Sequence, residues 1–509
     1  MKRILSASRS LILVWWLFPE EQELGSDLKI LFAVSELAGI VKTGGLADVA
    51  GALGPWMRKL GNDVRVIMPA YRQALEALTT DVVGVGEVCL GSYGNMGFAI
   101  RQGEFEGVPV YLIEHNQYFD RSGLYTHEGE GFGDNTERFA FFCKAALQAC
   151  QILSFKPDII HGHDWQSALL PYYLKIHESG NAFFADTRTV LTIHNGAYQQ
   201  HTDSALLDVL GIDHHWYTPD FFEDHGHINL LKGGIAFADK ITTVSPRYAE
   251  ELQTDLGSHG LAHVIGRRKQ DFSGILNGCD YQEWNPEMDA LLPANYSLDD
   301  LSGKQVCKQV LQERLQLPVI ADKPLYGLVS RLAEQKGFAY LIPALWQLLQ
   351  GDVQVVLQGS GDRATAAELN RLVSAFPDKC RFVEAYDNRL AHLIEAGSDF
   401  FLMPSLFEPC GLNQMYSMKY GTLPVVRAVG GLVDSVKGYG SAAEGATGFM
   451  FDSADSDALL HCLNQTRVVY QDSQLMSRLV SNAMSESFTW EQSAQDYLEV
   501  YRTALNVES

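Results

Sequence analysis

Short apolar runs alternate with helical stretches along nearly the whole chain, and this rhythm constrains the fold more than any other feature of the sequence. In the first half, the composition of buried strands occurs at residues 29–36, 62–69, 157–165, 189–195 and 240–245. Segments in which apolar residues recur at helical spacing lie between these runs. Such an alternation predicts a doubly wound parallel sheet. Residues 81–115 are different, because their short alternating runs predict hairpins added to that sheet.

The same rhythm returns in the second half, at residues 325–331, 353–359, 381–384, 399–404 and 423–427. A chain of 509 residues is too long for one ordinary core, so we expect two domains. The predicted fold class is therefore α/β, with two doubly wound domains. The predicted segments are an N-terminal extension at 1–27, a first domain at 28–285, a connector rich in Pro and Asp at 286–323, a second domain at 324–485 and a C-terminal helix within 486–509.

The first 27 residues precede the first predicted strand. Lys2 and Arg3 come before the apolar run 11–18, which is much shorter than the ~20 residues of a membrane span. Pro19 and three glutamates follow this run, in place of the small residues of a signal-peptide cleavage site. We interpret residues 1–27 as a dispensable, disordered extension, with a secretory signal peptide as the alternative.

The net charge excludes some classes of binding partner, and the cysteine pattern indicates the cellular compartment. A formal net charge of -23 argues against nucleic acid or an anionic membrane as a partner. An anionic ligand would need a local cluster of Lys and Arg, whereas a neutral polymer such as a glucan would meet no repulsion. The eight cysteines are scattered and form no CxxC pair, so we expect reduced thiols in a cytoplasmic protein.

The loop Lys42-Thr43-Gly44-Gly45 joins the first predicted strand to a helix that begins with Leu46. The first N–H groups of a helix have no intrahelical partner, so such a loop is suited to bind an anion. Two glycines allow close approach of the backbone, and Lys42 adds a cation. The alternative is a tight turn beside a surface lysine.

Polar residues also end later strands, at His161 and His163 and at His194 and Asn195. Ligands of open α/β sheets gather at the carboxyl ends of strands, so we expect these residues near the 42–45 loop. We interpret His163 as an active-site histidine. Metal binding by His161 and His163 is the alternative, although no third ligand of suitable spacing stands near.

Charged residues mark the strand ends of the second half. Arg331 and Lys336 lie between a strand and a helix, where both can reach one diphosphate. They could equally be two solvated cations. Glu408 stands near a predicted helix start, where its carboxylate either caps the helix or binds a sugar and stabilises positive charge.

Several motifs together resemble the bacterial glycogen synthase and starch synthase family. They are KTGGLADVAGAL, HGHDW, TIHNGAYQ, ILNGCD, VSRLAEQKG and FEPCGLNQMYSMKYGTLPVVRAVGGL, in the family's order and at its spacing from about Leu28 to Phe488. The resemblance implies the GT-B architecture, in which two Rossmann-like domains face a central cleft. It implies ADP-glucose as donor, the non-reducing end of an α-1,4-glucan (glycogen) as acceptor, retention of configuration, and no cofactor or essential metal. Related folds return their last helix to the first domain.

The resemblance also implies roles for individual residues. Lys42 and Gly45 would meet the donor from the first domain, and Tyr386 would lie near the adenine. The implied catalytic residues are His163 on the transferred glucose, Arg331 and Lys336 on the diphosphate, and Glu408 at the developing charge. The implied substrate-binding residues are Lys42, Gly44, Gly45, Asp48, His194, Asn195, Asn277, Tyr386, Cys410, Gly411, Leu412 and Asn413.

Two other functions fit the same architecture. A phosphorylase would need a lysine that binds pyridoxal phosphate as a Schiff base. A non-catalytic glucan-binding protein would be expected to lose at least one of Lys42, Arg331, Lys336 and Glu408, and all four are present.

Overall fold

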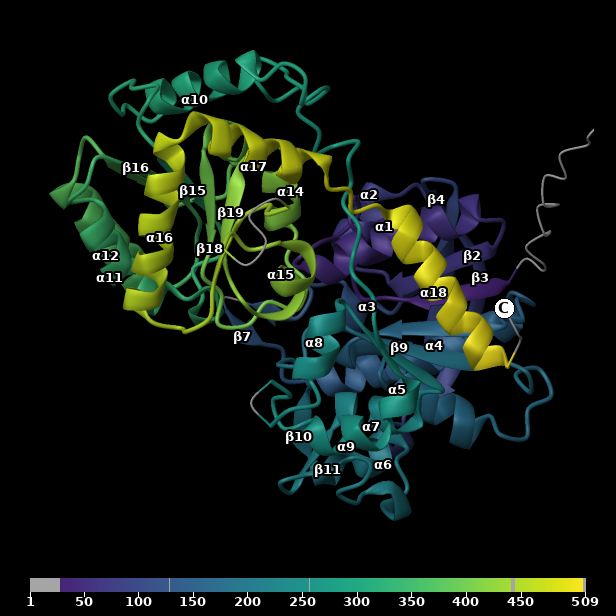
Figure 1. Ribbon diagram of the computed structural model, residues 1–509. Coiled ribbons are helices and arrows are strands. Elements are labelled where there is room, and N and C mark those ends of the chain that lie inside the picture. The colour runs from purple at the N-terminus through teal and green to yellow at the C-terminus, as the bar shows by residue number, and fades with distance from the viewer. Residues whose placement is uncertain (1–27, 128, 256, 441–444, 507–509) are drawn as a thin grey trace, which may run out of the picture.

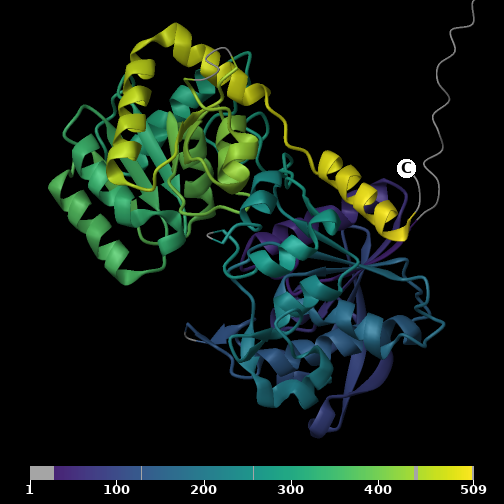
Figure 2. The same ribbon diagram turned by 60° about the horizontal axis from the view of Figure 1, so that its bottom comes forward.

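The computed structural model describes residues 28–127, 129–255, 257–440 and 445–506. Two α/β domains lie side by side, and the chain passes from the first to the second and back (Figures 1 and 2). Each domain has its own hydrophobic core. The interpretation of residues 1–27 as an extension concerns residues outside these ranges.

The first domain is built on a nine-stranded sheet with the order β14-β13-β9-β8-β1-β2-β5-β4-β3. Its strands are β1 (Lys29–Ala33), β2 (Asp63–Pro69), β3 (Asp81–Cys89), β4 (Asn95–Phe105), β5 (Val108–Glu114), β8 (Ile159–His163), β9 (Arg188–Ile193), β13 (Lys240–Thr243) and β14 (Phe272–Gly274). Only the pairs β3–β4 and β4–β5 are antiparallel. The hairpins predicted within 81–115 are therefore present, as an extension at one edge of a parallel sheet.

Helices cover both faces of this sheet because each has an apolar side. α1 (Gly45–Lys59) buries Leu46, Val49 and Leu53, which recur at helical spacing, and α4 (Asn135–Ile152) is buried along most of its length. The shorter helices are α2 (Arg72–Ala77), α3 (Asn116–Phe119), α5 (Leu169–Tyr172), α6 (Leu207–Leu210), α7 (Leu230–Phe237), α8 (Pro246–Glu251) and α9 (Ala262–Arg267). Small additional strands are β6 (Thr126–His127), β7 (Glu130–Gly131), β10 (His201–Asp203), β11 (Glu223–Asp224) and β12 (His227–Asn229).

The second domain contains a parallel six-stranded sheet with the order β17-β16-β15-β18-β19-β20. Its strands are β15 (Leu325–Val329), β16 (Gln354–Gln358), β17 (Cys380–Val383), β18 (Phe400–Met403), β19 (Leu423–Arg427) and β20 (Phe449–Phe451). Its helices are α10 (Ser302–Arg314), α11 (Phe338–Leu348), α12 (Arg363–Ala375), α13 (Asn388–Gly397), α14 (Asn413–Lys419), α15 (Gly430–Ser435), α16 (Ser456–Gln471) and α17 (Ser473–Ser485). Strands buried on both faces explain the continuous apolar runs in the sequence.

The two passages of the chain between the domains lie next to each other. The amide of Cys279 donates to the carbonyl of Phe488 at 2.8 Å, so the outgoing and returning segments are hydrogen-bonded. α18 (Trp490–Leu505) then lies on the first domain, whereas α16 and α17 belong to the second (Figures 1 and 2). The buried side chains of Trp490 and Tyr501 join the first core, and the Tyr501 hydroxyl is 2.8 Å from Nδ1 of His161.

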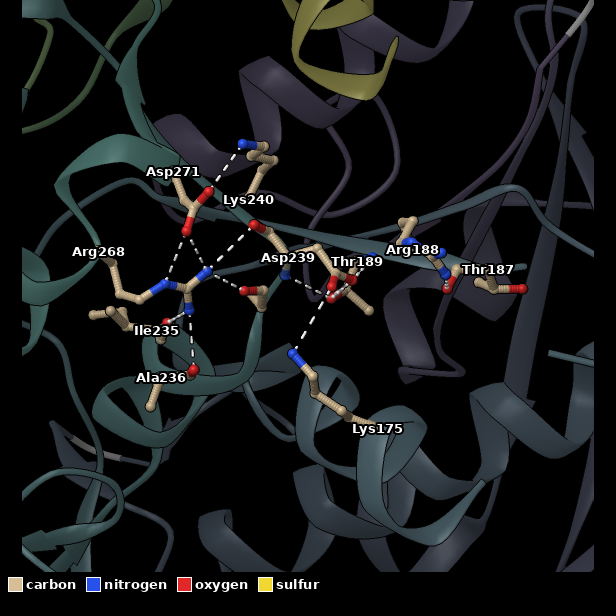
Figure 3. Close-up of polar contacts among 11 residues, drawn as sticks. Lys175, Thr187, Arg188, Thr189, Ile235, Ala236, Asp239, Lys240, Arg268 and Asp271 are labelled. Atoms are coloured by element: carbon tan, nitrogen blue, oxygen red, sulfur yellow. Dashed lines mark hydrogen bonds and ion pairs between the residues drawn. The ribbon is translucent and has the colours of Figure 1, made fainter. Parts of the chain in front are cut away.

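A network of charged side chains lies at the amino ends of β9 and β13 (Figure 3). The Arg268 guanidinium donates to the carbonyls of Ile235 and Ala236 at the end of α7, at 2.8 and 2.9 Å, and pairs with Asp271. Asp271 also binds Lys240 at 2.9 Å. These groups pair with one another at the amino ends of the strands, so they stabilise the domain at the edge opposite the candidate site residues.

None of the helices in the described part of the chain is both long and apolar enough to cross a bilayer.

Candidate active site

The parallel part of each sheet has one point where the strand order changes direction, and α/β sheets bind ligands at such points. In the first sheet this point lies between β1 and β8, and in the second it lies between β15 and β18. A cavity of about 670 Å³ is lined by both domains, and one of about 200 Å³ is lined by the second domain. Both are lined by Val329, Leu412 and Asn413, so the two cavities adjoin.

Arg331, Lys336 and Glu408 meet in the smaller cavity, at the switch point of the second sheet. Arg331 and Lys336 follow β15, and Glu408 lies between β18 and α14. Oε2 of Glu408 accepts hydrogen bonds from Nζ of Lys336 at 2.6 Å and from Oγ of Ser405 at 2.7 Å. The Glu408 side chain is only 8% exposed, and its hydrogen bonds with Lys336 and Ser405 fix the position of its carboxylate.

Arg331 provides a second cation in this cavity. It is exposed, and its guanidinium forms no hydrogen bond or ion pair with the residues that the structure describes. An unpaired guanidinium beside a lysine suits an oxyanion with several acceptor oxygens, such as a diphosphate.

The structure excludes one of the two interpretations of Glu408. α14 begins at Asn413, its N-cap is Leu412, and no side chain caps it. The Glu408 carboxylate faces Lys336 and Ser405 instead. The helix-capping interpretation is therefore wrong, and the carboxylate is available at the cavity.

The larger cavity contains predicted site residues from both domains. Lys42 and Asp48 line it from the first domain, and Tyr386 lines it from the second. Nζ of Lys42 pairs with Oδ1 of Asp48 at 2.6 Å. Tyr386 is 68% exposed, so its ring is free to contact a planar group.

The 42–45 loop binds an anion, but that anion is part of the protein. The buried Glu36 carboxylate accepts from the amide of Thr43 at 2.5 Å, from its hydroxyl at 2.6 Å and from the amide of Gly44 at 3.1 Å. This differs from the expectation that these N–H groups face a ligand phosphate. A Cβ added to Gly44 or Gly45 would meet no atom within 4 Å, so the glycines leave open space beside Lys42.

His163 and His194 form a buried pair at the carboxyl ends of β8 and β9. Nδ1 of His163 is 3.0 Å from Nε2 of His194, and Nε2 of His163 is buried with no partner among the described residues. Burial lowers the pKa of His194 to about 3 and that of His163 well below its usual value, so both rings are neutral. Asp164 fixes the turn between them, since it accepts from the His194 amide at 2.7 Å.

His161 has a structural role. Its ring nitrogens contact the Tyr501 hydroxyl at 2.8 Å and the Thr192 hydroxyl at 2.6 Å, so neither nitrogen is available to a metal. Within the described ranges, His, Cys, Asp and Glu side chains form no group of three or more that could hold a metal ion.

Some of the other predicted site residues line a cavity, and the rest do not. Gly411, Leu412 and Asn413 line the smaller cavity, and the last two also line the larger one. The linings of both cavities exclude Gly44, Gly45, His163, His194, Asn195, Asn277 and Cys410. Asn277 is nevertheless buried with an unpaired Oδ1.

Sequence reasoning missed two residues of this site, Glu36 and Ser405. Glu36 lies three residues after β1 and Ser405 lies two residues after β18, so both occupy the strand-end position that identified the other candidates. Their position was a usable signal. Their partners were not predictable from spacing, because Glu36 bonds to a loop seven residues away.

Comparison with known proteins places this site in a family. The profile described as the starch synthase catalytic domain matches residues 29–267, and that of glycosyl transferases group 1 matches residues 312–484. A glycogen synthase of Aeromonas salmonicida is 48% identical over 489 residues, which are 94% of this chain and 99% of the relative. A glycogen synthase of Vibrio parahaemolyticus is 47% identical over 485 residues, again 94% and 99%.

Solved structures agree with the sequence relatives. The catalytic domain of starch synthase IV from Arabidopsis thaliana, bound to ADP and acarbose, superposes with a TM-score of 0.86 and 34% identity, over 94% of this chain and 100% of that one. Sucrose-phosphate synthase from Thermosynechococcus elongatus, with a TM-score of 0.57 and 18% identity over 94% of this chain and 99% of that one, shares the fold. With two Rossmann-like domains in the GT-B arrangement, the chain belongs to the bacterial glycogen synthase and starch synthase family of glycosyltransferases.

Proposed function

We propose that the protein transfers glucose from ADP-glucose to the non-reducing end of an α-1,4-glucan, with retention of configuration and release of ADP. The observation that carries this proposal is the joined pair of cavities, where two cations and a carboxylate adjoin a cleft lined by both domains. The family membership supports the same activity, since the relatives are named glycogen synthase.

Departure of ADP requires stabilisation of a diphosphate. In the proposal, Arg331 and Lys336 bind its oxygens, and Lys42 approaches from the first domain. Lys336 would then exchange part of its contact with Glu408 for a phosphate oxygen. Fixed cations at the point where negative charge develops lower the barrier, because they need no reorganisation during the reaction.

The sugar acquires positive charge as its bond to phosphate breaks. Glu408 supplies a fixed negative charge in the same cavity as the two cations, so one small site can stabilise both halves of the separating pair. The acceptor hydroxyl would attack from the face that the phosphate leaves, and the departing phosphate would accept its proton. This route accounts for retention.

The first domain would contact the glucose through uncharged side chains. Nε2 of His163 is buried without a partner in the described structure, so a sugar hydroxyl at this atom would satisfy it. His163 lines neither cavity, so in the proposal this contact forms when the two domains close on the donor. The Nδ1 contact with His194 orients the ring. Asn195, Asn277 and the backbone of Gly411 are proposed as further contacts of the substrates, and Tyr386 as the residue beside the adenine.

We place this reaction in the cytoplasm. All eight cysteines lie in the described ranges and none is in a disulfide, which fits a reducing compartment. The proposed partners are ADP-glucose and the glycogen primer, and the net charge of -23 disfavours nucleic acid and anionic membranes.

A donor screen tests the proposal. The purified protein is incubated with glycogen and with ADP-, UDP- or GDP-glucose, and release of each nucleoside diphosphate is measured. ADP-glucose is expected to give the highest kcat/KM, and a higher value for UDP-glucose would contradict the donor assignment. Glucose 1-phosphate as the only donor tests a phosphorylase, and the absence of turnover with every donor would favour a non-catalytic glucan-binding protein.

A further inference from the structure

A contact between the two domains lies next to the backbone of the segment that carries Glu408. α8 of the first domain follows β13, α15 of the second domain follows β19, and the two helices pack against each other (Figure 1). Both are short, so their contact depends on polar groups at their ends as well as on apolar side chains.

Each helix supplies a carboxylate to a backbone N–H of the other. Oε1 of Glu251, at the end of α8, accepts from the amide of Gly430 at 2.9 Å. Oδ2 of Asp434, in α15, accepts from the amide of Arg247 at 2.8 Å. We call these two hydrogen bonds the clasp. A carboxylate that accepts from the first turn of a helix is stabilising, because those N–H groups lack intrahelical partners.

The start of α15 is pressed against the backbone that carries Glu408. The amide of Gly431 donates to the carbonyl of Glu408 at 3.1 Å. A Cβ on Gly430 would lie 1.9 Å from that carbonyl oxygen, and one on Gly431 would lie 2.3 Å from the carbonyl oxygen of Cys410. Because there is no free space here, a shift of α15 must shift residues 408–410.

The first domain also holds this loop directly. The buried Ser245 hydroxyl donates to the carbonyl of Pro409 at 2.6 Å. Ser245 is the N-cap of α8 and accepts from the amide of Tyr248. The same short segment of the first domain therefore contacts both α15 and the residue next to Glu408.

We propose that the clasp positions the Glu408 carboxylate, so that Glu251 and Asp434 are positioning residues for glucosyl transfer. This inference rests on the proposed function of Glu408. The clasp fixes the carboxylate relative to the sugar only while the two domains are in contact, so it ties charge stabilisation to the arrangement of the domains. Arg331 and Lys336 follow β15, whereas Glu408 follows β18, and neither cation belongs to a segment that the clasp contacts. In this proposal the clasp therefore affects turnover more than ADP binding.

The test compares Glu251→Ala, Glu251→Gln and Glu250→Ala in the full chain. Glu251→Ala removes the acceptor, and we expect kcat with ADP-glucose and glycogen to fall about tenfold, with the Kd of ADP changed less than twofold. Glu251→Gln retains an acceptor oxygen and is expected to recover most of kcat. Glu250→Ala is the matched control, since Glu250 is exposed and belongs to the same helix. Arg247 pairs with Glu250 at 2.9 Å and with Oε1 of Glu251 at 3.4 Å, so a near-normal kcat in this variant shows that the ion pairs of Arg247 do not account for the effect of Glu251→Ala.

Combination with Glu408→Gln shows whether the effect passes through Glu408. If it does, Glu251→Ala should slow the Glu408→Gln enzyme much less than it slows the unmodified enzyme. An equal slowing of both, or a normal kcat in Glu251→Ala, overturns the inference. Asp434→Ala repeats the test if Glu251→Ala does not fold. If Glu408→Gln alone has normal turnover, the proposed function of Glu408 fails and this inference fails with it. If only Glu408→Gln is slow, the proposed function stands and the clasp alone is rejected.

Discussion

The two domains place opposite kinds of polar residue at equivalent points in their sheets. At the switch point of the first sheet, His163 and His194 are buried and neutral, because burial lowers the pKa of both rings. At the switch point of the second sheet, Arg331, Lys336 and Glu408 place formal charges at a cavity. The same topology can therefore carry either a buried neutral pair or a charged cavity, and the residue types at the strand ends determine which.

The buried histidines show the same contrast. Burial alone would lower the pKa of His392 in α13, but its hydrogen bond with Asp289 and the nearby Glu283 carboxylate outweigh that effect and raise it. Its Nδ1 is 2.8 Å from Asp289, and its ring stacks on Trp284 with a centroid distance of 3.8 Å. The first domain keeps its buried histidines uncharged, and the second pairs its own with carboxylates.

The largest effect on turnover should come from the charged cavity of the second domain. Glu408→Gln keeps the shape of the side chain and removes its charge, so we expect turnover to fall by a factor of ~10² to 10³. The Kd of ADP should change little, because the diphosphate is assigned to the cations. Turnover, ADP affinity and Tm are measured on one preparation, and normal turnover would show that the carboxylate is not needed.

Removal of the Arg331 guanidinium should weaken the binding of ADP. Arg331→Ala is expected to weaken ADP binding by a factor of about 10 to 100, since hydrogen bonds to charged groups contribute about 1.5–3 kcal/mol. Titration calorimetry with ADP measures this. Arg371→Ala, which removes an exposed arginine of α12, is the control. Unchanged ADP affinity in Arg331→Ala would mean that the diphosphate is bound elsewhere.

A smaller effect is expected from the loop that the first domain contributes to the cleft. Glu36→Gln weakens the anchor of the 42–45 loop, so we expect KM for ADP-glucose to rise about three- to tenfold as Lys42 loses its fixed position. Tyr125→Phe removes a 2.8 Å hydrogen bond to Glu36 but leaves the loop contacts, and it should change KM less. A loss in Tm without any change in KM would show that Glu36 stabilises the fold alone.

The smallest effect concerns the pH dependence of stability. Because the pKa of His392 is raised in the folded state, its stabilisation is fully present below the unfolded value of about 6.5 and is lost as pH rises through the folded value. Tm should therefore fall by a few degrees on the alkaline side, and His392→Gln should remove this dependence. An identical alkaline decline in the variant would assign it to other groups.

The fold was largely predictable from the sequence, because strands buried on both faces leave long apolar runs and the polar residues that follow mark their carboxyl ends. The candidates at the strand ends, such as Arg331 and Glu408, were predictable for the same reason. Contacts between distant segments were not. Nothing in the spacing indicates that Glu36 fills the anion site of the 42–45 loop, or that Glu251 reaches Gly430, because these contacts depend on tertiary placement.

The return of the last helix has a consequence for synthesis on the ribosome. α18 supplies buried aromatic residues to the first core, yet it is translated after the whole second domain. Domains usually fold in the order in which they emerge, but this first domain cannot complete its core until its final sixteen-residue helix leaves the exit tunnel. The second domain is in effect an insertion into the first. It must fold while its host is still incomplete, and a premature stop near the end of the message would damage the domain that was made first.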